Sequence, residues 1–329
     1  MVNQNEKQIL NLPFTGICSF GKYPICQDLE NLSADVAVIG VPNDMGTQWK
    51  SGARMGPRGI REGSTLYSFG LDGAYDIEKD EMYLGPKWNV VDCGDVDMVH
   101  GDLDQCHENT EEAIRKIVSK GALPVVLGGD HSITIPVGRA LENLGPFHVI
   151  QIDAHLDWAD HRSGQRNGHG NCIRRLSEMD HVKEIFQFGI RGISSSTKED
   201  VDAARDYGST ILSPRQMRKM GLEEVLDLLP KGERYYITID IDGLDPSAAP
   251  GTGTPSPGGF LYDEVNELIE GITQRGEVIG FDLVEVAPPY DHTGITSQVG
   301  ARISLDLLSF ILKERERSEN KQVLVSNNK

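Results

Sequence analysis

The chain has 329 residues, 38% of them hydrophobic and 25% charged, a composition typical of a folded globular protein. Its formal net charge of −18 makes nucleic acid and anionic membranes poor partners. Such a charge would attract a cationic small substrate. More often, however, it indicates only a solvated acidic surface. The five cysteines are scattered without a C-x-x-C pair, the N-terminus lacks an apolar leader, and no run approaches the roughly 18 apolar residues of a membrane span, all of which favour a cytoplasmic protein.

Short apolar runs alternate with longer amphipathic stretches along most of the chain. The runs are rich in Val and Ile and do not alternate with polar residues, which is typical of strands buried on both faces. The predicted strands are Val36–Val41, Trp88–Val91, Leu123–Leu127, His148–Ile152, Ile185–Ile190, Ser209–Leu212, Tyr235–Ile239 and Val278–Val284. The predicted helices are 109–120, capped by Asn109 and Glu112, and then Ser132–Asn143, Thr197–Tyr207, Leu222–Leu229, Leu261–Arg275 and Thr296–Lys313.

This alternation predicts an α/β fold with three layers, in which helices cover both faces of a mostly parallel sheet of about eight strands. We expect one domain over residues 34–316, an irregular lead-in over 1–33, and a polar, frayed tail over 317–329. Ligands of such sheets collect at the carboxyl ends of the strands. The polar residues that follow each strand are therefore the first candidates for a site.

Three predicted strand ends carry acids and histidines. The first reads Gly128-Gly129-Asp130-His131-Ser132, the second Asp153-Ala154-His155-Leu156-Asp157, and the third Asp240-Ile241-Asp242. In an extended chain, residues two apart point to the same side, so we expect the acids and histidines of the second and third segments to converge. Carboxylates so close repel one another unless a cation neutralises them.

Two histidines and four aspartates exceed the needs of one tetrahedral zinc and suit two divalent first-row ions. A two-metal site activates and positions a water for attack. A single motif of this kind is more often a capping aspartate or a satisfied histidine. Three at separate strand ends favour a functional site.

These segments, in this order, resemble the ureohydrolases, the family of arginase, agmatinase and related guanidino-acid hydrolases. The resemblance extends from about Val36 to Leu312 and is most specific in the run from Asp240 to Pro255. It implies an arginase-like fold, oligomerisation as a trimer or hexamer, and two ions, usually manganese and in some members nickel. One ion would take His131, Asp153, Asp157 and Asp240, and the other His155, Asp153, Asp240 and Asp242.

The resemblance also assigns roles to catalytic and substrate-binding side chains. Asp157 would relay a proton, His169 would shuttle a proton to the departing amine, and Glu285 would bind the substrate guanidinium, with Thr254 orienting that end. Without the resemblance, Glu285 reads as a plain strand-end acid and His169 as a loop histidine.

The choice of guanidino substrate rests on weaker signals. Ala159 and Gln165 stand where arginase has the asparagine and serine that read the amino-acid head group, which argues against arginine. Asn171 stands where agmatinase-like members often have threonine, and Arg166 could bind the carboxylate of a guanidino acid or be an ordinary solvated arginine. Trp49 and Trp158 could narrow the pocket or belong to the core or an interface. We expect agmatine first, and guanidine, a small alkyl-guanidine or a guanidino acid close behind.

Two other interpretations remain open from the sequence. A zinc amide hydrolase of the deacetylase type would need one catalytic metal, against which the full ligand set counts. An inactive partner subunit of a homologous hydrolase predicts a lost ligand, and none is lost. A complete set of roles for the chemistry favours the enzyme.

Overall fold

The computed structural model describes residues 12–68, 73–193 and 195–327. Its centre is a parallel sheet of eight strands in the order β4-β1-β5-β10-β9-β6-β7-β8. In that order the strands are Val90–Asp95, Val36–Val41, Leu123–Gly128, Glu277–Val284, Arg234–Asp240, Phe147–Ile152, Val182–Phe188 and Thr210–Leu212. A hairpin of β2 (Ala74–Asp76) and β3 (Glu81–Tyr83), which the sequence did not predict, lies outside the sheet.

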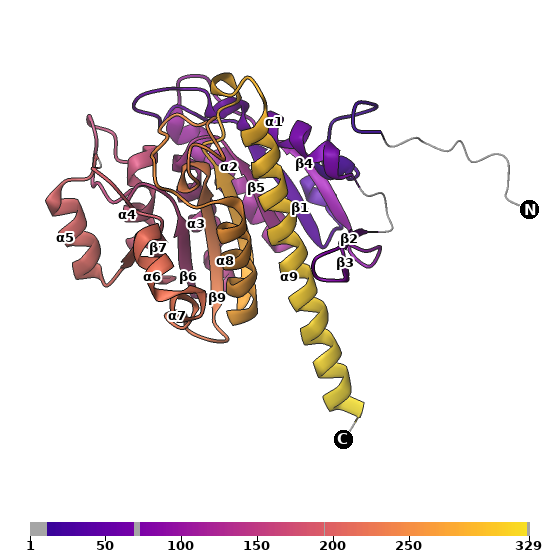
Figure 1. Ribbon diagram of the computed structural model, residues 1–329. Coiled ribbons are helices and arrows are strands. Elements are labelled where there is room, and N and C mark those ends of the chain that lie inside the picture. Colours follow the sequence, from indigo (N-terminus) through magenta and orange to yellow (C-terminus); the bar gives the residue numbers. More distant parts are fainter. Residues whose placement is uncertain (1–11, 69–72, 194, 328–329) are drawn as a thin grey trace, which may run out of the picture.

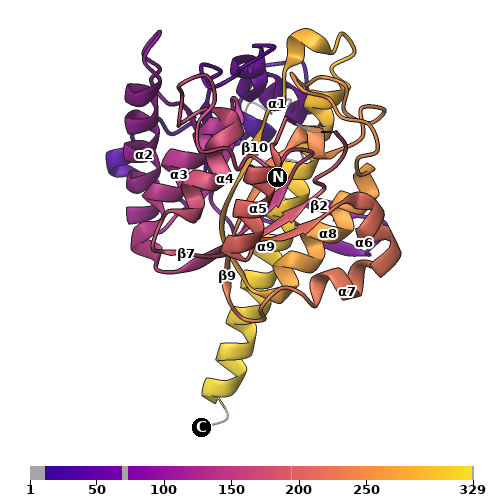
Figure 2. The ribbon, with the colours of Figure 1, turned by 90° about the vertical axis from the view of Figure 1, so that its left-hand side faces the viewer.

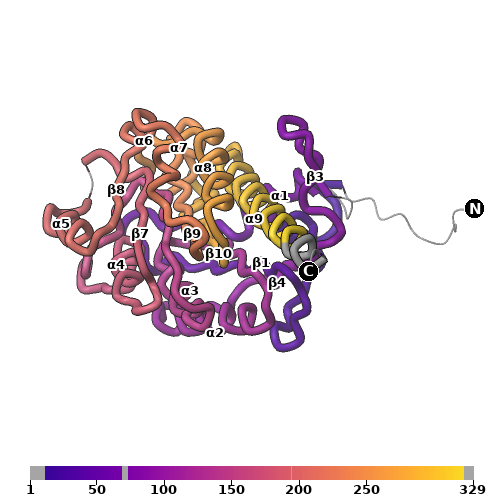
Figure 3. Tube along the Cα trace, turned by 90° about the horizontal axis from the view of Figure 1, so that it is seen from below, coloured from indigo at the N-terminus to yellow at the C-terminus, as the bar shows by residue number. Residues whose placement is uncertain are grey.

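Helices cover both faces of this sheet, as Figures 1 and 2 show. Seen along its edge in Figure 3, α2, α3 and α4 lie on one side, and α6, α7, α8 and α9 on the other. The helices are α1 (Gly56–Ser64), α2 (Leu103–Ser119), α3 (Thr134–Ala140), α4 (Cys172–Ser177), α5 (Lys198–Tyr207), α6 (Pro214–Met220), α7 (Leu222–Leu226), α8 (Tyr262–Arg275) and α9 (Ile295–Asn327). The predicted three-layer α/β fold is confirmed.

The core explains why the strand sequences do not alternate. In β1, Val36 and Val38 belong to the apolar cluster on one face of the sheet, while Ala37 and Ile39 belong to the cluster on the other. Successive strand residues point to opposite faces, and both faces are covered, so every position of β1 is apolar.

Several predicted boundaries are wrong for local reasons. Helix α2 begins at Leu103 and not at Asn109, because the Asp102 side chain accepts a hydrogen bond from the main-chain nitrogen of Gln105 and caps it there. The helix predicted over Ser132–Asn143 is α3 flanked by two short 3-10 turns. Helices α1, α4 and α6 were not predicted; they are short and leave little periodic signal.

Residues 317–327 of the expected polar tail continue helix α9, which ends at Asn327. Residues 1–11 of the lead-in and 328–329 of the tail lie outside the described residues. By length and hydropathy, Ile295–Lys321 would suit a membrane span, which the sequence analysis overlooked. However, 72% of its most apolar window is buried, and α9 packs on α1 and α8. Its apolar character is therefore that of a core helix.

Candidate metal centre and active site

The acids and histidines singled out in the sequence meet at the carboxyl ends of four adjacent strands, β5, β10, β9 and β6. His131 follows β5, the segment 153–157 follows β6, Asp240 ends β9, and Glu285 follows β10. Gly129 makes the approach of β5 to its neighbouring loop possible, because a Cβ there would lie 1.9 Å from the main-chain oxygen of Asn43. The close packing of these strand ends brings His131 and Glu285, which are 154 positions apart in the sequence, into one cluster.

Two histidines of the cluster face shared carboxylates. His131 Nδ1 lies 3.1 Å from Asp153 Oδ2, 3.1 Å from Asp157 Oδ2 and 3.4 Å from Asp240 Oδ2. His155 Nδ1 lies 3.6 Å from the other oxygen of Asp153, Oδ1. It also lies 3.1 Å from Asp242 Oδ2. Asp153 thus presents one oxygen to each histidine, which is the arrangement of a carboxylate that bridges two cations.

The convergence has a different cause from the one predicted. Residues 153–157 form no strand, and Asp157 has a φ of +50°, in the left-handed region that L-residues other than Asn and Asp rarely adopt. Asp242 likewise lies in a 3-10 turn after β9. The side chains meet because the chain turns at the strand ends, and not because an extended segment repeats every two residues.

The protonation of His131 can be deduced from its hydrogen bonds. Thr238 Oγ1 donates its only proton to Asp282 Oδ1 at 2.5 Å, so towards His131 it must accept. His131 Nε2, 2.8 Å from Thr238 Oγ1, therefore carries the ring proton. Nδ1 is buried and faces the carboxylates. Burial opposes protonation of the ring, but the neighbouring thiol and carboxylates raise its pKa well above the ordinary value, so a metal would bind at Nδ1 in place of a proton.

The charges of the cluster also call for cations. Burial, together with the neighbouring charges of Asp242 and Asp153, raises the pKa of Asp240 well above its ordinary value. Burial and the charge of Asp153 also raise the pKa of Asp157. Among the described residues, no lysine or arginine forms an ion pair with these carboxylates. Two imidazoles and four carboxylates fit a pair of divalent first-row ions.

Glu285 and His169 form a second unit beside this cluster. Glu285 Oε1 accepts hydrogen bonds from His169 Nδ1 at 2.9 Å and from the main-chain nitrogen of His131 at 3.0 Å. Burial opposes protonation of His169, but the hydrogen bond and charge of Glu285 outweigh it and raise its pKa to about 9. Glu285 has a φ of +63°, so two of the six described non-glycine residues with positive φ, Asp157 and Glu285, are in the site.

The substrate-binding residues expected from the sequence lie in other surroundings. Trp158 is 1% exposed and packs in the core, with its ring centroid 5.4 Å from that of Tyr207. Asn171 is fully buried and donates to the main-chain oxygen of Ala159 at 2.7 Å. Trp158 therefore packs as a core residue, and the Asn171 side chain is bound to the main chain of Ala159.

Arg166 and Thr254, two other expected substrate-binding residues, are paired with side chains of the protein itself. The Arg166 side chain is 57% exposed and pairs with Asp160 at 3.0 Å, as the solvated interpretation predicts. Thr254 Oγ1 donates to Asp242 Oδ2 at 3.0 Å, so its contact is with a candidate metal ligand. Trp49 is 67% exposed.

The sequence analysis missed the residues that hold the ligands in place. Asp282 accepts from Thr238, from Thr134 at 2.8 Å and from the Tyr236 hydroxyl, and so fixes the partner of His131. Arg191 Nη2 donates to the main-chain oxygen of Asp242 at 2.7 Å. A signal was present: Thr238 and Asp282 are polar residues inside otherwise apolar strands, where a buried polar group needs a partner.

Comparison with known proteins places this site in context. The sequence model of the Arginase family matches residues 34–309. The chain is 37% identical to guanidinobutyrase from Pseudomonas aeruginosa, covering 90% of this chain and 92% of that protein. It is 35% identical to mitochondrial agmatinase from Gallus gallus, covering 89% and 85%. The solved structure of proclavaminate amidinohydrolase from Streptomyces clavuligerus matches with a TM-score of 0.80 at 32% identity, covering 91% of this chain and 98% of that chain.

Proposed function

This chain belongs to the arginase family, and from that premise we propose that it hydrolyses agmatine to urea and putrescine. Family membership confirms the resemblance drawn from the sequence. It also confirms the reaction class, hydrolysis of a C–N bond in a guanidino compound. The substrate, the roles of individual residues and the metal are the parts proposed here.

The observation that carries the proposal is the position of the Glu285 carboxylate. It is 2% exposed, and Oε1 is occupied by His169 and by the main chain of His131. Within the described residues this leaves Oε2 to accept N–H groups of a planar guanidinium in a charge-assisted contact. A guanidinium held there lies beside the ligands of the metal centre, because Glu285 bonds directly to the main chain of one of them.

Each remaining group has a role in the reaction. Two divalent ions, when bound, lower the pKa of water and so make a nucleophile available at neutral pH. Asp157 accepts the proton that the nucleophile loses and orients it toward the guanidinium carbon. His169, whose pKa is raised to about 9, carries a proton at neutral pH and delivers it to the departing amine. We propose manganese as the usual ion, with nickel as the alternative.

Agmatine is favoured by charge. It is a dication, and the chain carries a net charge of −18. Arg166, the residue considered for a substrate carboxylate, is already paired with Asp160 and lies 3.8 Å from Glu178 Oε1. The chain resembles an agmatinase over most of its length.

One observation favours a guanidino acid as the second candidate. Lys50 Nζ lies 4.5 Å from the Trp49 ring centroid and 5.4 Å from that of Tyr290, and no carboxylate of the described residues pairs with it. Its main chain adjoins Gly253, next to Thr254, which bonds Asp242. The Lys50 ammonium, beside the proposed site, would pair with the carboxylate of a short guanidino acid. Two of the relatives, a guanidinobutyrase and a guanidinopropionase, are named for substrates of this class.

The test is urea release by protein loaded separately with manganese and nickel. The panel is agmatine, 4-guanidinobutyrate, 3-guanidinopropionate, guanidine, methylguanidine and arginine. Highest kcat/KM on agmatine supports the proposal, and highest kcat/KM on a guanidino acid replaces it with the second candidate. In that case Lys50→Met should raise KM for the acid by about tenfold, the worth of about 1.4 kcal/mol, and leave KM for guanidine unchanged. No urea from any substrate, with two ions bound, would refute both.

A further inference from the structure

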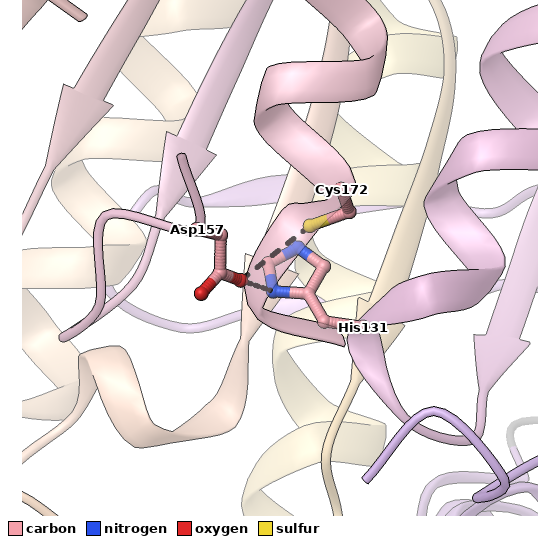
Figure 4. Close-up of side chains that lie close together, drawn as sticks. All are labelled: His131, Asp157 and Cys172. Atoms are coloured by element: carbon pink, nitrogen blue, oxygen red, sulfur yellow. Dashed lines mark hydrogen bonds and ion pairs between the residues drawn. The ribbon is translucent and has the colours of Figure 1, made fainter. Parts of the chain in front are cut away.

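Cys172 places a thiol against the metal centre. It is the first residue of α4 and is fully buried. Its Sγ lies 3.4 Å from Asp157 Oδ2, the same oxygen that lies 3.1 Å from His131 Nδ1 (Figure 4). The sulfur, the carboxylate oxygen and the imidazole nitrogen all lie within 4.8 Å of one another. The family resemblance assigns Cys172 no role.

A second observation, independent of the cysteine, points to a cation at this corner. His131 Nδ1 is buried, has no hydrogen-bond partner among the described residues and faces Asp157. Metal–ligand bonds of about 2.3 Å to sulfur and about 2.1 Å to nitrogen or oxygen put tetrahedral S···O and N···O pairs about 3.6 Å and 3.4 Å apart. The corresponding distances here are 3.4 Å and 3.1 Å. These two distances are therefore within a few tenths of an ångström of those in a metal site, and the third, from the sulfur to the imidazole nitrogen, is below 4.8 Å.

We propose that His131, Asp157 and Cys172 form a site for a thiophilic divalent cation such as Zn²⁺ or Co²⁺. On binding, the sulfur–metal bond forms as the thiol proton passes to solvent, so one proton is released for each ion bound. Thiolate selects zinc and cobalt over the harder manganese, which prefers oxygen ligands.

The site shares His131 and Asp157 with the proposed catalytic metal centre. The inference therefore rests on the proposed function, because the competition described next requires that centre to bind manganese. An ion held by Cys172 occupies His131 and Asp157. Zinc and manganese should therefore compete, with zinc favoured by the sulfur. The cysteine would thus decide which metal the protein holds when both are supplied.

The test is a Co²⁺ titration of metal-free, full-length protein, followed by absorption spectroscopy. Wild type should show a sulfur-to-cobalt charge-transfer band in the near ultraviolet. Cys172→Ser should lack it, and Cys18→Ser, at an exposed thiol, should keep it. Zn²⁺ affinity should fall at least tenfold in Cys172→Ser, while Mn²⁺ affinity changes less than twofold.

Absence of the band in wild type, or its persistence in Cys172→Ser, would overturn the proposal and leave Cys172 as a buried residue whose thiol donates to Asp157. X-ray absorption on the wild-type zinc protein gives an answer that needs no variant: one sulfur neighbour at about 2.3 Å supports the site, and none refutes it. Urea release by manganese-loaded wild type is measured in parallel. Urea without a cobalt band refutes only the thiophilic site, and a cobalt band without urea refutes only the proposed function.

Discussion

Two groups of carboxylates, each with buried members, are neutralised in opposite ways in this protein. Beneath α1, Arg61 donates to Asp92 through Nε at 2.8 Å and Nη2 at 3.0 Å, and to Asp95 through Nη1 at 2.6 Å. At the centre of the sheet, the aspartates at positions 153, 157, 240 and 242 form ion pairs, among the described residues, only with the two histidines. One group carries its cation within the chain, and the other requires cations from outside.

The Arg61 group is therefore expected to stabilise the fold, and the aspartates at the centre of the sheet are expected to serve metal binding and catalysis. A carboxylate paired with a buried guanidinium is satisfied in the folded chain, so its removal affects folding. A cluster of carboxylates without such a partner is costly until ions bind, and such clusters occur at sites selected for binding or catalysis. Mutations in the two groups should therefore affect different measurements.

The largest effect is expected for Asp153→Asn. The variant removes the charge shared by both ion positions, and we expect kcat/KM for urea release to fall about 1,000-fold, equivalent to about 4 kcal/mol. Bound metal, measured by atomic emission, should fall below two ions per chain. Asp202→Asn, at an exposed aspartate beside Lys198, should keep both values. Near-full turnover in Asp153→Asn would show that Asp153 does not bridge.

Arg61→Met should produce the reverse pattern. Loss of the guanidinium leaves Asp92 buried without a countercharge, and we expect unfolding free energy to fall by about 3 kcal/mol in urea denaturation. The folded fraction should still bind two ions. Arg166→Ala, which removes a surface pair, should cost less than about 1 kcal/mol. If Arg61→Met lost its metal but kept its stability, the separation of the two groups would be wrong.

A smaller effect on metal binding is expected for Asp282→Asn, at the carboxylate that accepts the hydrogen bond of Thr238 and so orients His131. An amide can still accept from Thr238, but it lacks the charge that favours one orientation of the hydroxyl and hence one tautomer of His131. Manganese affinity should fall by about 10- to 100-fold, the usual cost of losing a group that orients a metal-binding histidine. Isothermal titration calorimetry measures this directly, and excess manganese should restore urea release. A loss of activity that excess metal does not restore would contradict this positioning role.

The sequence predicted the residues of the centre better than the way they are held. His131, Asp153 and Asp240 stand at strand ends because buried apolar runs stop there, and such runs are visible in sequence. The turn at Asp157 and the capping of α2 by Asp102 depend on local hydrogen bonds that carry no periodic signal. Trp158 could not be assigned to core or pocket until the packing of α5 against it was known.

The smallest effect, on the free energy of unfolding, is expected at Asp291. This buried carboxylate is stabilised in a third way, by peptide N–H groups near the start of α9. Asp291 Oδ2 accepts from the main-chain nitrogen of Thr296 at 2.7 Å, and Oδ1 from that of Thr293 at 3.0 Å. The Thr293 hydroxyl also donates to Oδ1, at 2.6 Å. Burial raises the pKa of this carboxyl, but the hydroxyl bond and the main-chain bonds together outweigh burial and lower the pKa to about 2.

A pKa lowered from 3.8 to about 2 means that the stabilisation is complete above pH 3.8 and is lost as pH falls through 2. In metal-free protein, Asp291→Asn should lower unfolding free energy by about 1 kcal/mol at pH 7, as expected for a lost helix cap. The gap from wild type should narrow between pH 4 and pH 2, because the unfolded wild-type chain binds a proton at this carboxyl below pH 3.8 and the folded chain does so only near pH 2. A gap that stayed constant over this range would show that the charge of Asp291 contributes nothing, and that the peptide groups need only an acceptor, whereas the metal centre needs a charge.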